Sequence, residues 1–345
     1  MLQTTRLWGV LITGLAITGA TASAADPALL NLVMPDAKVL AGMNATSARI
    51  SPFGRFILAK IGAARAGAIG QDRTFAELGF NPLQDISEIL AASSADPANP
   101  GAIVLASGNF PVDKIKSALA GQTNPQVQNY NGATLLIESG KDNKINHAVA
   151  FLGTNIAIAG DLASVKAAVD RQTNPSAIDT ALALKVKDLS GAKDEWVVSV
   201  APIASLIPAN AVQGNAAQGP AGQVLPLLKS IQSFAGGVQL TDTIALSGEA
   251  VTSDARNAAA LQAVLKLGIA LVSSQGANNT QLEDVMKILQ SLQVTTNGAA
   301  VDLALSIPES QVESLINSAQ QLRVKAVAAQ GLRQRHSPAN VNNGR

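Results

Sequence analysis

The 345-residue chain contains no cysteine and only two histidines, His147 and His336. Without cysteine it cannot build a disulfide-stabilised scaffold, a cysteine-ligated zinc site, an iron–sulfur cluster or a thiol nucleophile. The two histidines lie far apart in the sequence, and they give little support to a multi-histidine metal site. We therefore expect neither a bound metal nor a cofactor.

Aromatic and charged residues are also scarce. They make up 3% and 14% of the chain, whereas 47% of the residues are hydrophobic and the net charge is +1. The large apolar fraction and the small net charge exclude an intrinsically disordered chain. Single-stranded nucleic-acid sites combine a basic groove with stacking aromatic rings. The composition therefore argues against a nucleic-acid partner.

The N-terminal segment has the three parts of a secretory signal peptide. Arg6 precedes an uncharged, mostly apolar run over residues 7–20, and Ala22-Ser23-Ala24 forms a small-x-small cleavage site. An uncleaved anchor is the alternative, but the apolar run is shorter than the about 20 residues that span a bilayer. We predict a signal peptide over 1–24 with cleavage after Ala24. An exported chain without cysteine fits the bacterial periplasm or the surrounding medium.

No later segment has the pattern of a transmembrane helix. The most apolar one, 258–272, has Lys266 at its centre and is interpreted as a buried helix. We therefore expect the chain to be soluble after the signal peptide is removed.

Charge is unevenly distributed over the remaining chain. Residues 25–320 carry a net charge of −5, whereas 321–345 hold five basic residues and no acidic one: Arg323, Lys325, Arg333, Arg335 and Arg345. The last segment ends in a polar stretch rich in Asn, Pro and Gly, which is typical of a disordered tail. Two interpretations stay open, namely attachment to an anionic surface and a solvated terminus beside the acidic body.

A short strand followed by a turn and a helix recurs along the chain. The pattern occurs over 101–120, 155–170, 195–209 and 299–317. Proline opens three of these helices, where its missing N–H would have no helical partner anyway, and Asp161 takes the capping position in the fourth. Polar segments separate the patterned regions, and those over 121–131 and 210–223 are expected to be loops.

Hairpin turns decide the expected fold class. Two alternating apolar runs meet at each of three turns, at Gly153-Thr154, near Thr241-Asp242 and at Asn297-Gly298. Hairpins favour antiparallel over parallel sheets. We predict an α+β fold with antiparallel sheets, helices packed on one face, and two related modules over 25–189 and 190–320.

The sequence assigns no catalytic residue. Ser190 and Lys193 have the Ser-x-x-Lys spacing in which a lysine activates a serine one helical turn away, but they lie in a polar turn without a downstream Lys-Thr-Gly. His147 opens an expected strand and is interpreted as a surface or hydrogen-bonded residue. Trp196 alternates with apolar neighbours and is expected in the core.

The acidic residues are scattered along the chain. Asp85 and Glu88 lie at an expected turn or helix start, and Asp302 lies on the polar face of its strand. Acid–base chemistry needs two carboxyl groups that converge, and the sequence neither supports nor excludes such a pair.

Several short motifs resemble an arrangement found in uncharacterised exported bacterial proteins. In these a Gly-Phe-x-Pro…Asp-Ile segment precedes a strand, a Gly-x-Phe segment precedes a helix, and a Gly-Asp…Val-x-x-Ala segment closes the unit. The matching residues here are Gly79, Phe80, Pro82, Asp85, Ile86, Gly108, Phe110, Gly160, Asp161, Val165 and Ala168. The resemblance covers about half of the chain. It implies an exported α+β protein and supplies no catalytic residues.

Three functional hypotheses follow. The leading one is a non-enzymatic protein of the bacterial envelope or medium that acts as an interaction or scaffolding module, with an envelope protein or a lipid as partner. The second is a binder of an apolar ligand such as a lipid, held by the apolar helices expected over 254–273 and 281–292. The third is a hydrolase with an unrecognised site.

Overall fold

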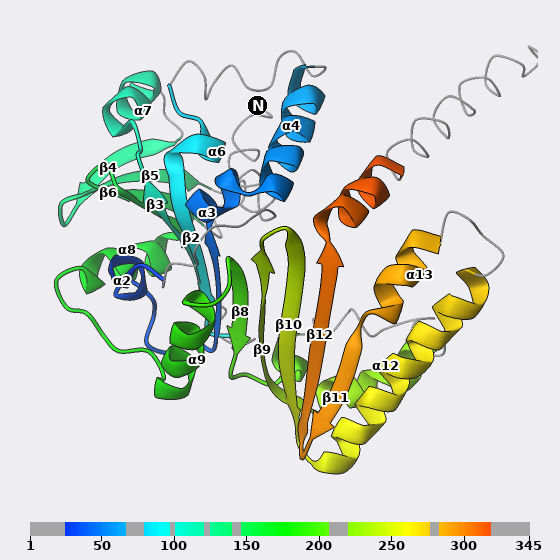
Figure 1. Cartoon of the computed structure of the whole chain (residues 1–345). Coiled ribbons are helices and arrows are strands. Elements are labelled where there is room, and N and C mark those ends of the chain that lie inside the picture. The colour runs from blue at the N-terminus through cyan, green and yellow to red at the C-terminus, as the bar shows by residue number, and fades with distance from the viewer. Residues whose placement is uncertain are drawn as a thin grey trace, which may run out of the picture.

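The computed structural model describes residues 25–66, 79–96, 101–120, 125–139, 146–206, 220–276 and 283–318. The segment 1–24, predicted to be a signal peptide, lies outside these residues, as do His336 and the basic segment 321–345. Twelve strands form one antiparallel sheet, with helices against both of its faces (Figure 1). The predicted α+β class with antiparallel pairing is confirmed. The expectation that helices pack on one face only is wrong, because apolar side chains on both faces of the sheet need cover.

Strands and helices alternate along the chain in the following order. The first part contributes α2 (Pro27–Leu30), β1 (Val39–Asn44), α3 (Ala45–Ile50), α4 (Pro52–Ala66), α6 (Pro82–Asp85), β2 (Ile86–Ser93), β3 (Ala102–Gly108), α7 (Val112–Leu119), β4 (Gln126–Tyr130), β5 (Ala133–Ser139), β6 (Asn146–Leu152), β7 (Ile156–Asp161), α8 (Leu162–Arg171) and α9 (Thr180–Ser190). The second part contributes β8 (Glu195–Ser199), α10 (Ile203–Leu206), α11 (Pro220–Lys229), β9 (Ile231–Leu240), β10 (Thr243–Thr252), α12 (Ala255–Gly276), α13 (Glu283–Gln290), β11 (Gln293–Asn297) and β12 (Ala300–Pro308). A helix over 309–318 follows β12.

The same strand order occurs twice in the sheet. The full order is β11-β12-β10-β9-β8-β1-β2-β3-β7-β6-β5-β4. Outward from the centre, β1-β2-β3-β7-β6 in the first half has the same arrangement as β8-β9-β10-β12-β11 in the second. The antiparallel pair β1–β8 joins the halves. The modules expected from the sequence therefore share one continuous sheet.

Side chains alternate between the two faces of the sheet, which we name after β1 residues the Leu40 face and the Met43 face. In the first half the Leu40 face carries the largest core cluster, covered by side chains of α2, α8 and α9. The Met43 face of that half carries a second cluster around Phe110 and Phe151. In the second half the Met43 face is the one covered, by α12.

Trp196 packs at the seam between the two halves. It lies directly opposite Gly42 in the β1–β8 pairing and is only 6% exposed, as its expected place in the core requires. A Cβ atom added at Gly42 would lie 2.4 Å from Cζ2 of the indole ring. Glycine is therefore required here, because the ring occupies the space of a side chain.

Turn and cap residues explain where most elements begin and end. The three predicted hairpins form, between β6 and β7, β9 and β10, and β11 and β12. Gly153 and Gly298 adopt positive φ values of 57° in their turns, a conformation open to glycine. Asp161 caps α8 as predicted, since its carboxylate accepts a hydrogen bond from the N–H of Ser164 at 2.9 Å.

Two segments differ from the expectation of loops. Residues 126–130, inside the polar segment 121–131, form strand β4. It is held by pairing with β5 across a turn at Asn131 and Gly132, whose φ values are 45° and 84°. Of the predicted loop over 210–223, residues 210–219 lie outside the described residues, and the last four positions begin helix α11 at Pro220. Proline suits the first turn of a helix, and the leucines that follow can pack.

Candidate interaction surface

Helix α12 packs one face onto the sheet. Ala258 and Leu261 are 0% and 4% exposed, and they join a cluster with Val294 and Val301 of β11 and β12. Leu265 and Ile269 pack against the same cluster. These spacings of three and four residues define the core side of the helix.

The opposite side of α12 is also apolar, although it faces away from the core. Leu267 and Leu271 are 59% and 54% exposed, and Ala259, Ala263 and Ala270 are exposed as well. Leu267 and Leu271 are neighbours on the helix surface because they are four residues apart. We call these five residues the outer stripe of α12. Single exposed leucines are common in proteins, whereas a helix that is apolar on both sides is typical of one covered from both sides.

The expectation of a buried helix over 258–272 is therefore correct for one side only. The sequence analysis did not identify the outer stripe, although Ala259, Ala263, Leu267 and Leu271 are spaced by four residues. No described helix is both long and apolar enough to cross a membrane.

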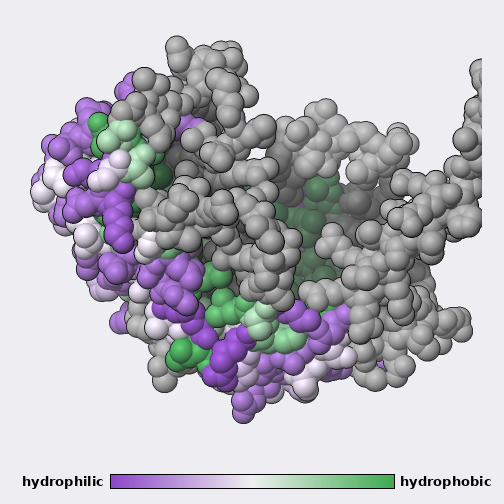
Figure 2. Space-filling view, turned by 90° about the horizontal axis from the view of Figure 1, so that it is seen from above, coloured by the Kyte–Doolittle hydropathy of each residue, from purple (hydrophilic) through white to green (hydrophobic). Residues whose placement is uncertain are grey.

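A second apolar region lies on the Met43 face of the second half. Leu246 of β10 is 39% exposed, and its strand neighbours Val238 and Leu305 are half-buried. Seen from above, the molecule is hollowed, and hydrophobic residues lie in the depth of the hollow (Figure 2).

The Ser-x-x-Lys pair does not form a nucleophilic site. Ser190 ends α9 and is 2% exposed, so a substrate cannot reach its hydroxyl group. Lys193 lies in the turn after the helix, where its backbone N–H donates to the carbonyl of Leu189 at 2.8 Å. The Lys193 side chain lies against Gly237 of β9.

Asp85, Glu88 and Asp302 are the three candidate carboxylates, and the contacts of Asp85 and Asp302 are those of structural residues. Asp85 accepts a hydrogen bond from the N–H of Asn81 at 2.6 Å, which stabilises the short helix α6. Asp302 lies opposite Glu249 in the β10–β12 pairing, on the Leu40 face. Glu249 in turn pairs with Lys185 of α9 at 2.8 Å. The lysine offsets the repulsion between two acidic residues that face each other across strands.

Glu88 is the carboxylate with the most unusual environment. It lies on β2 opposite Asn44, on the Leu40 face, and both of its oxygens accept from the backbone N–H of Asp26, at 3.1 and 3.2 Å. Burial raises the pKa of Glu88 to about 7, the Asp26 N–H lowers it, and the negative charge of Asp26 raises it again.

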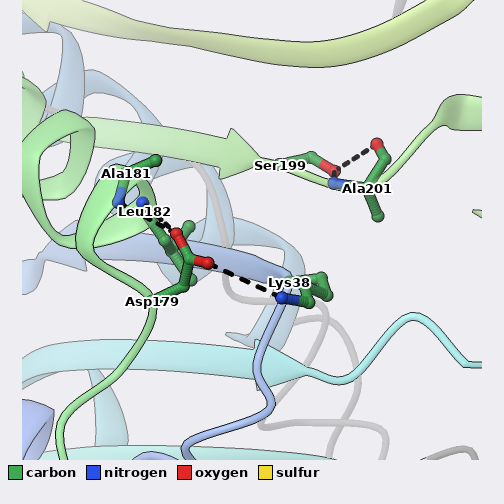
Figure 3. A network of polar contacts seen from close by, with 6 residues as sticks. All are labelled: Lys38, Asp179, Ala181, Leu182, Ser199 and Ala201. Carbon is green, nitrogen blue, oxygen red and sulfur yellow. Dashed lines mark hydrogen bonds and ion pairs between the residues drawn. The ribbon is translucent and has the colours of Figure 1, made fainter.

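A polar network fixes the start of β1 to α9 (Figure 3). Asp179 caps α9 through the N–H groups of Ala181 and Leu182, at 2.9 and 3.2 Å, and lies 3.7 Å from Nζ of Lys38. Ser199 is fully buried, and its hydroxyl group exchanges hydrogen bonds with the backbone of Ala201 at 3.0 and 3.2 Å. Asp179 thus bonds to Lys38 and to the start of α9, and Ser199 bonds separately to Ala201, so both sets of contacts lie within the fold.

His147 is exposed on β6 and pairs in register with Glu138 and Asp161. Among the described residues, no group of three or more His, Asp and Glu side chains is placed to hold a metal ion.

The residues that carry the resemblance to exported bacterial proteins pack in the core or allow close backbone contacts. Phe80, Phe110 and Phe151 form a chain of rings with centroids 5.7 Å apart. A Cβ at Gly108 would lie 2.2 Å from the carbonyl oxygen of Asp85, so the two backbones approach too closely for a side chain. Val165 and Ala168 of α8 are fully buried in the largest core cluster.

No family model matches the chain, and no curated protein matches it either. Among solved structures, the chain is similar to crystal forms of TP0453. Form I has a TM-score of 0.45 at 11% identity and covers 86% of this chain and 98% of that one. Forms III and IV have TM-scores of 0.42 and 0.41 at 9% identity, with 86% and 87% of this chain and 99% of that chain covered. A likeness at this level carries no argument about function.

Proposed function

We propose that the chain is an exported bacterial protein that acts by binding a partner protein in the envelope or medium through the outer stripe of α12, and not by catalysis. Its candidate serine is buried, and Asp85, Asp161 and Asp179 accept hydrogen bonds that hold turns or helix starts. The N-terminal segment supports export.

The outer stripe carries the proposal. The core side of α12 is already packed on the sheet, so Leu267 and Leu271 contribute nothing to that core. Exposing two adjacent leucines to water is unfavourable by roughly 25 cal/mol per Å² of apolar surface. A partner that covers the stripe removes this surface from water. Arg256 and Lys266 are exposed on the same helix and can contribute to a polar rim.

Crosslinking in the exporting cell tests the proposal. A photo-crosslinking residue at Ala263, within the stripe, is expected to trap a defined partner. The double substitution Leu267→Ser/Leu271→Ser should abolish the crosslinked species without changing the amount of exported protein. Leu184→Ser is the matched control, because Leu184 is equally exposed, at 59%, but lies on α9. Identical crosslinking by all three proteins would contradict the proposal.

A second candidate function is the binding of an apolar ligand such as a lipid. One support is the hollow with hydrophobic residues in its depth (Figure 2). A separate support is the partial exposure of Leu246 on β10. Extraction of the purified protein into organic solvent, followed by mass spectrometry, tests it. Wild-type protein should release a lipid, and Leu246→Lys should release much less. A wild-type protein that releases none would contradict this function.

We also propose that the two halves arose by internal duplication. The repeated strand order supports this origin, as does the helix that follows the corresponding strands β7 and β12. The strands β4 and β5 extend only the first half.

A further inference from the structure

The beginning of the described chain lies inside the fold. Ala25 is 5% exposed and belongs to the largest core cluster, together with Leu29 of α2. Asp26 follows it and donates its backbone N–H to both oxygens of Glu88. The chain just after the predicted cleavage site is therefore fixed against β2, 62 residues further along the sequence.

Cleavage after Ala24 places a new charged group at this point. It would turn the backbone nitrogen of Ala25 into a primary ammonium, three covalent bonds from the nitrogen of Asp26. Two backbone nitrogens so connected are at most about 3.6 Å apart. Once the peptide bond to Ala24 is gone, rotation about ψ of Ala25 can turn the ammonium towards the carboxylate of Glu88.

We propose that Glu88 is a built-in binding site for the α-ammonium group of Ala25, which signal-peptide cleavage creates, so that processing completes the fold through an internal ion pair. This inference rests on the export part of the proposed function and is independent of the outer stripe of α12.

The charges around Glu88 explain why it needs this partner. Its burial favours the neutral carboxyl group and raises its pKa to about 7, and the charge of Asp26 acts in the same direction. The residues opposite it on the neighbouring strands, Asn44 and Ser107, are uncharged. A cation placed beside Glu88 reverses the balance, because it favours the carboxylate and lowers its pKa. The same pairing raises the pKa of the α-amino group above its ordinary value of about 8.

Four versions of the mature chain test the ion pair. One begins at Ala25 with a free amino group, one carries a Gly-Ser extension before Ala25, and each is also made with Glu88→Gln. We expect the extension to raise the unfolding equilibrium constant about tenfold at neutral pH, the factor that corresponds to one pKa unit of stabilisation. With Glu88→Gln, the two N-termini should give equal constants. Asp113→Asn is the control for loss of a negative charge, since its side chain is 98% exposed, and it should leave the effect of the extension unchanged.

A second measurement reports the amino group directly. At neutral pH an acylating reagent should modify the α-amino group of the folded Ala25 chain about tenfold more slowly than that of its Glu88→Gln variant, because the ion pair keeps the amine protonated. Equal rates would overturn the proposal, and so would an extension effect that persists with Glu88→Gln. An exported protein whose intact mass places its first residue elsewhere than Ala25 would also overturn it, whatever binds to α12. A failure of partner binding would leave these comparisons untouched.

Discussion

We predict that Gly42→Ala, a very small substitution in the β1–β8 pair that joins the two halves, lowers the free energy of unfolding substantially. Gly42→Ala would place a methyl group 2.4 Å from Cζ2, 2.5 Å from Cε2 and 2.8 Å from Nε1 of Trp196. Carbon atoms in contact are best about 3.5–4.0 Å apart, so the ring would have to move by roughly 1 Å. Trp196 is only 6% exposed, so its ring is enclosed by neighbouring residues that would have to move with it. Overpacking of this kind costs about 1–3 kcal/mol, and we expect a loss of about 2 kcal/mol in the free energy of unfolding.

Urea unfolding followed by tryptophan fluorescence measures this loss. The chain has two tryptophans, and Trp8 lies within the predicted signal peptide, so Trp196 is the single reporter in a chain that begins at Ala25. Gly248→Ala is the matched control, because a methyl group there would lie 3.5 Å from its nearest neighbour, the carbonyl oxygen of Ala235. We expect it to stay within about 0.5 kcal/mol of wild type or to stabilise slightly.

A double-substitution cycle separates the ring from other causes. Trp196→Leu removes the atoms that clash, so Gly42→Ala should cost much less in that background, measured by circular dichroism. A Gly42→Ala protein as stable as wild type, or an equal cost with and without the ring, would refute this account of the seam.

Two further predictions concern titrating groups. Burial raises the pKa of Asp161, but hydrogen bonds from Ser164 and neighbouring N–H groups outweigh burial and hold it below its ordinary value. Its contribution to stability is therefore present at neutral pH and lost as the pH falls through this lowered pKa. Asp161→Asn keeps an accepting oxygen and removes only the charge, so it should cost about 0.3–1 kcal/mol at pH 7 in urea unfolding. The cost should shrink as the pH falls from about 4 through the lowered pKa, and a cost that does not change with pH would argue against the ionised cap. The hydrogen bond to Asp170 raises the pKa of Tyr130, with burial and the charge of Asp170 adding to it. Tyr130 is the only tyrosine, so ultraviolet titration should give a pKa above 10 that falls towards 10 in Asp170→Asn, and an unchanged midpoint would disprove the contact.

Features with a local cause could be predicted from the sequence. The turn at Asn297-Gly298 and the cap at Asp161 depend on residues within a few positions of each other, and the structure contains both. Trp196 was expected in the core because it alternates with apolar neighbours, and it is buried there.

Features that depend on distant parts of the chain could not be predicted. The polar residues of β4 have no strand pattern of their own and are held by β5. The β1–β8 pairing joins segments from opposite halves of the chain, and nothing local marks it. The contact between Asp26 and Glu88 likewise depends on how the N-terminal segment crosses the sheet.

The sequence predicts the helix that carries the outer stripe of α12, but not which of its sides is exposed. An apolar helix over 258–272 could be recognised, but the side that packs on Val294 and Val301 is decided by the fold. Only the structure shows that Leu267 and Leu271 are left outside that core.

Native mass spectrometry of the exported protein, purified from the periplasm or medium, tests the central claim most directly. We expect wild-type protein to carry the mass of a bound protein partner, and Leu267→Ser/Leu271→Ser to have the mass of a single chain. Leu184→Ser should behave as wild type. A wild-type protein found only at the mass of one chain, or a double variant that keeps the same partner, would contradict binding through the outer stripe of α12.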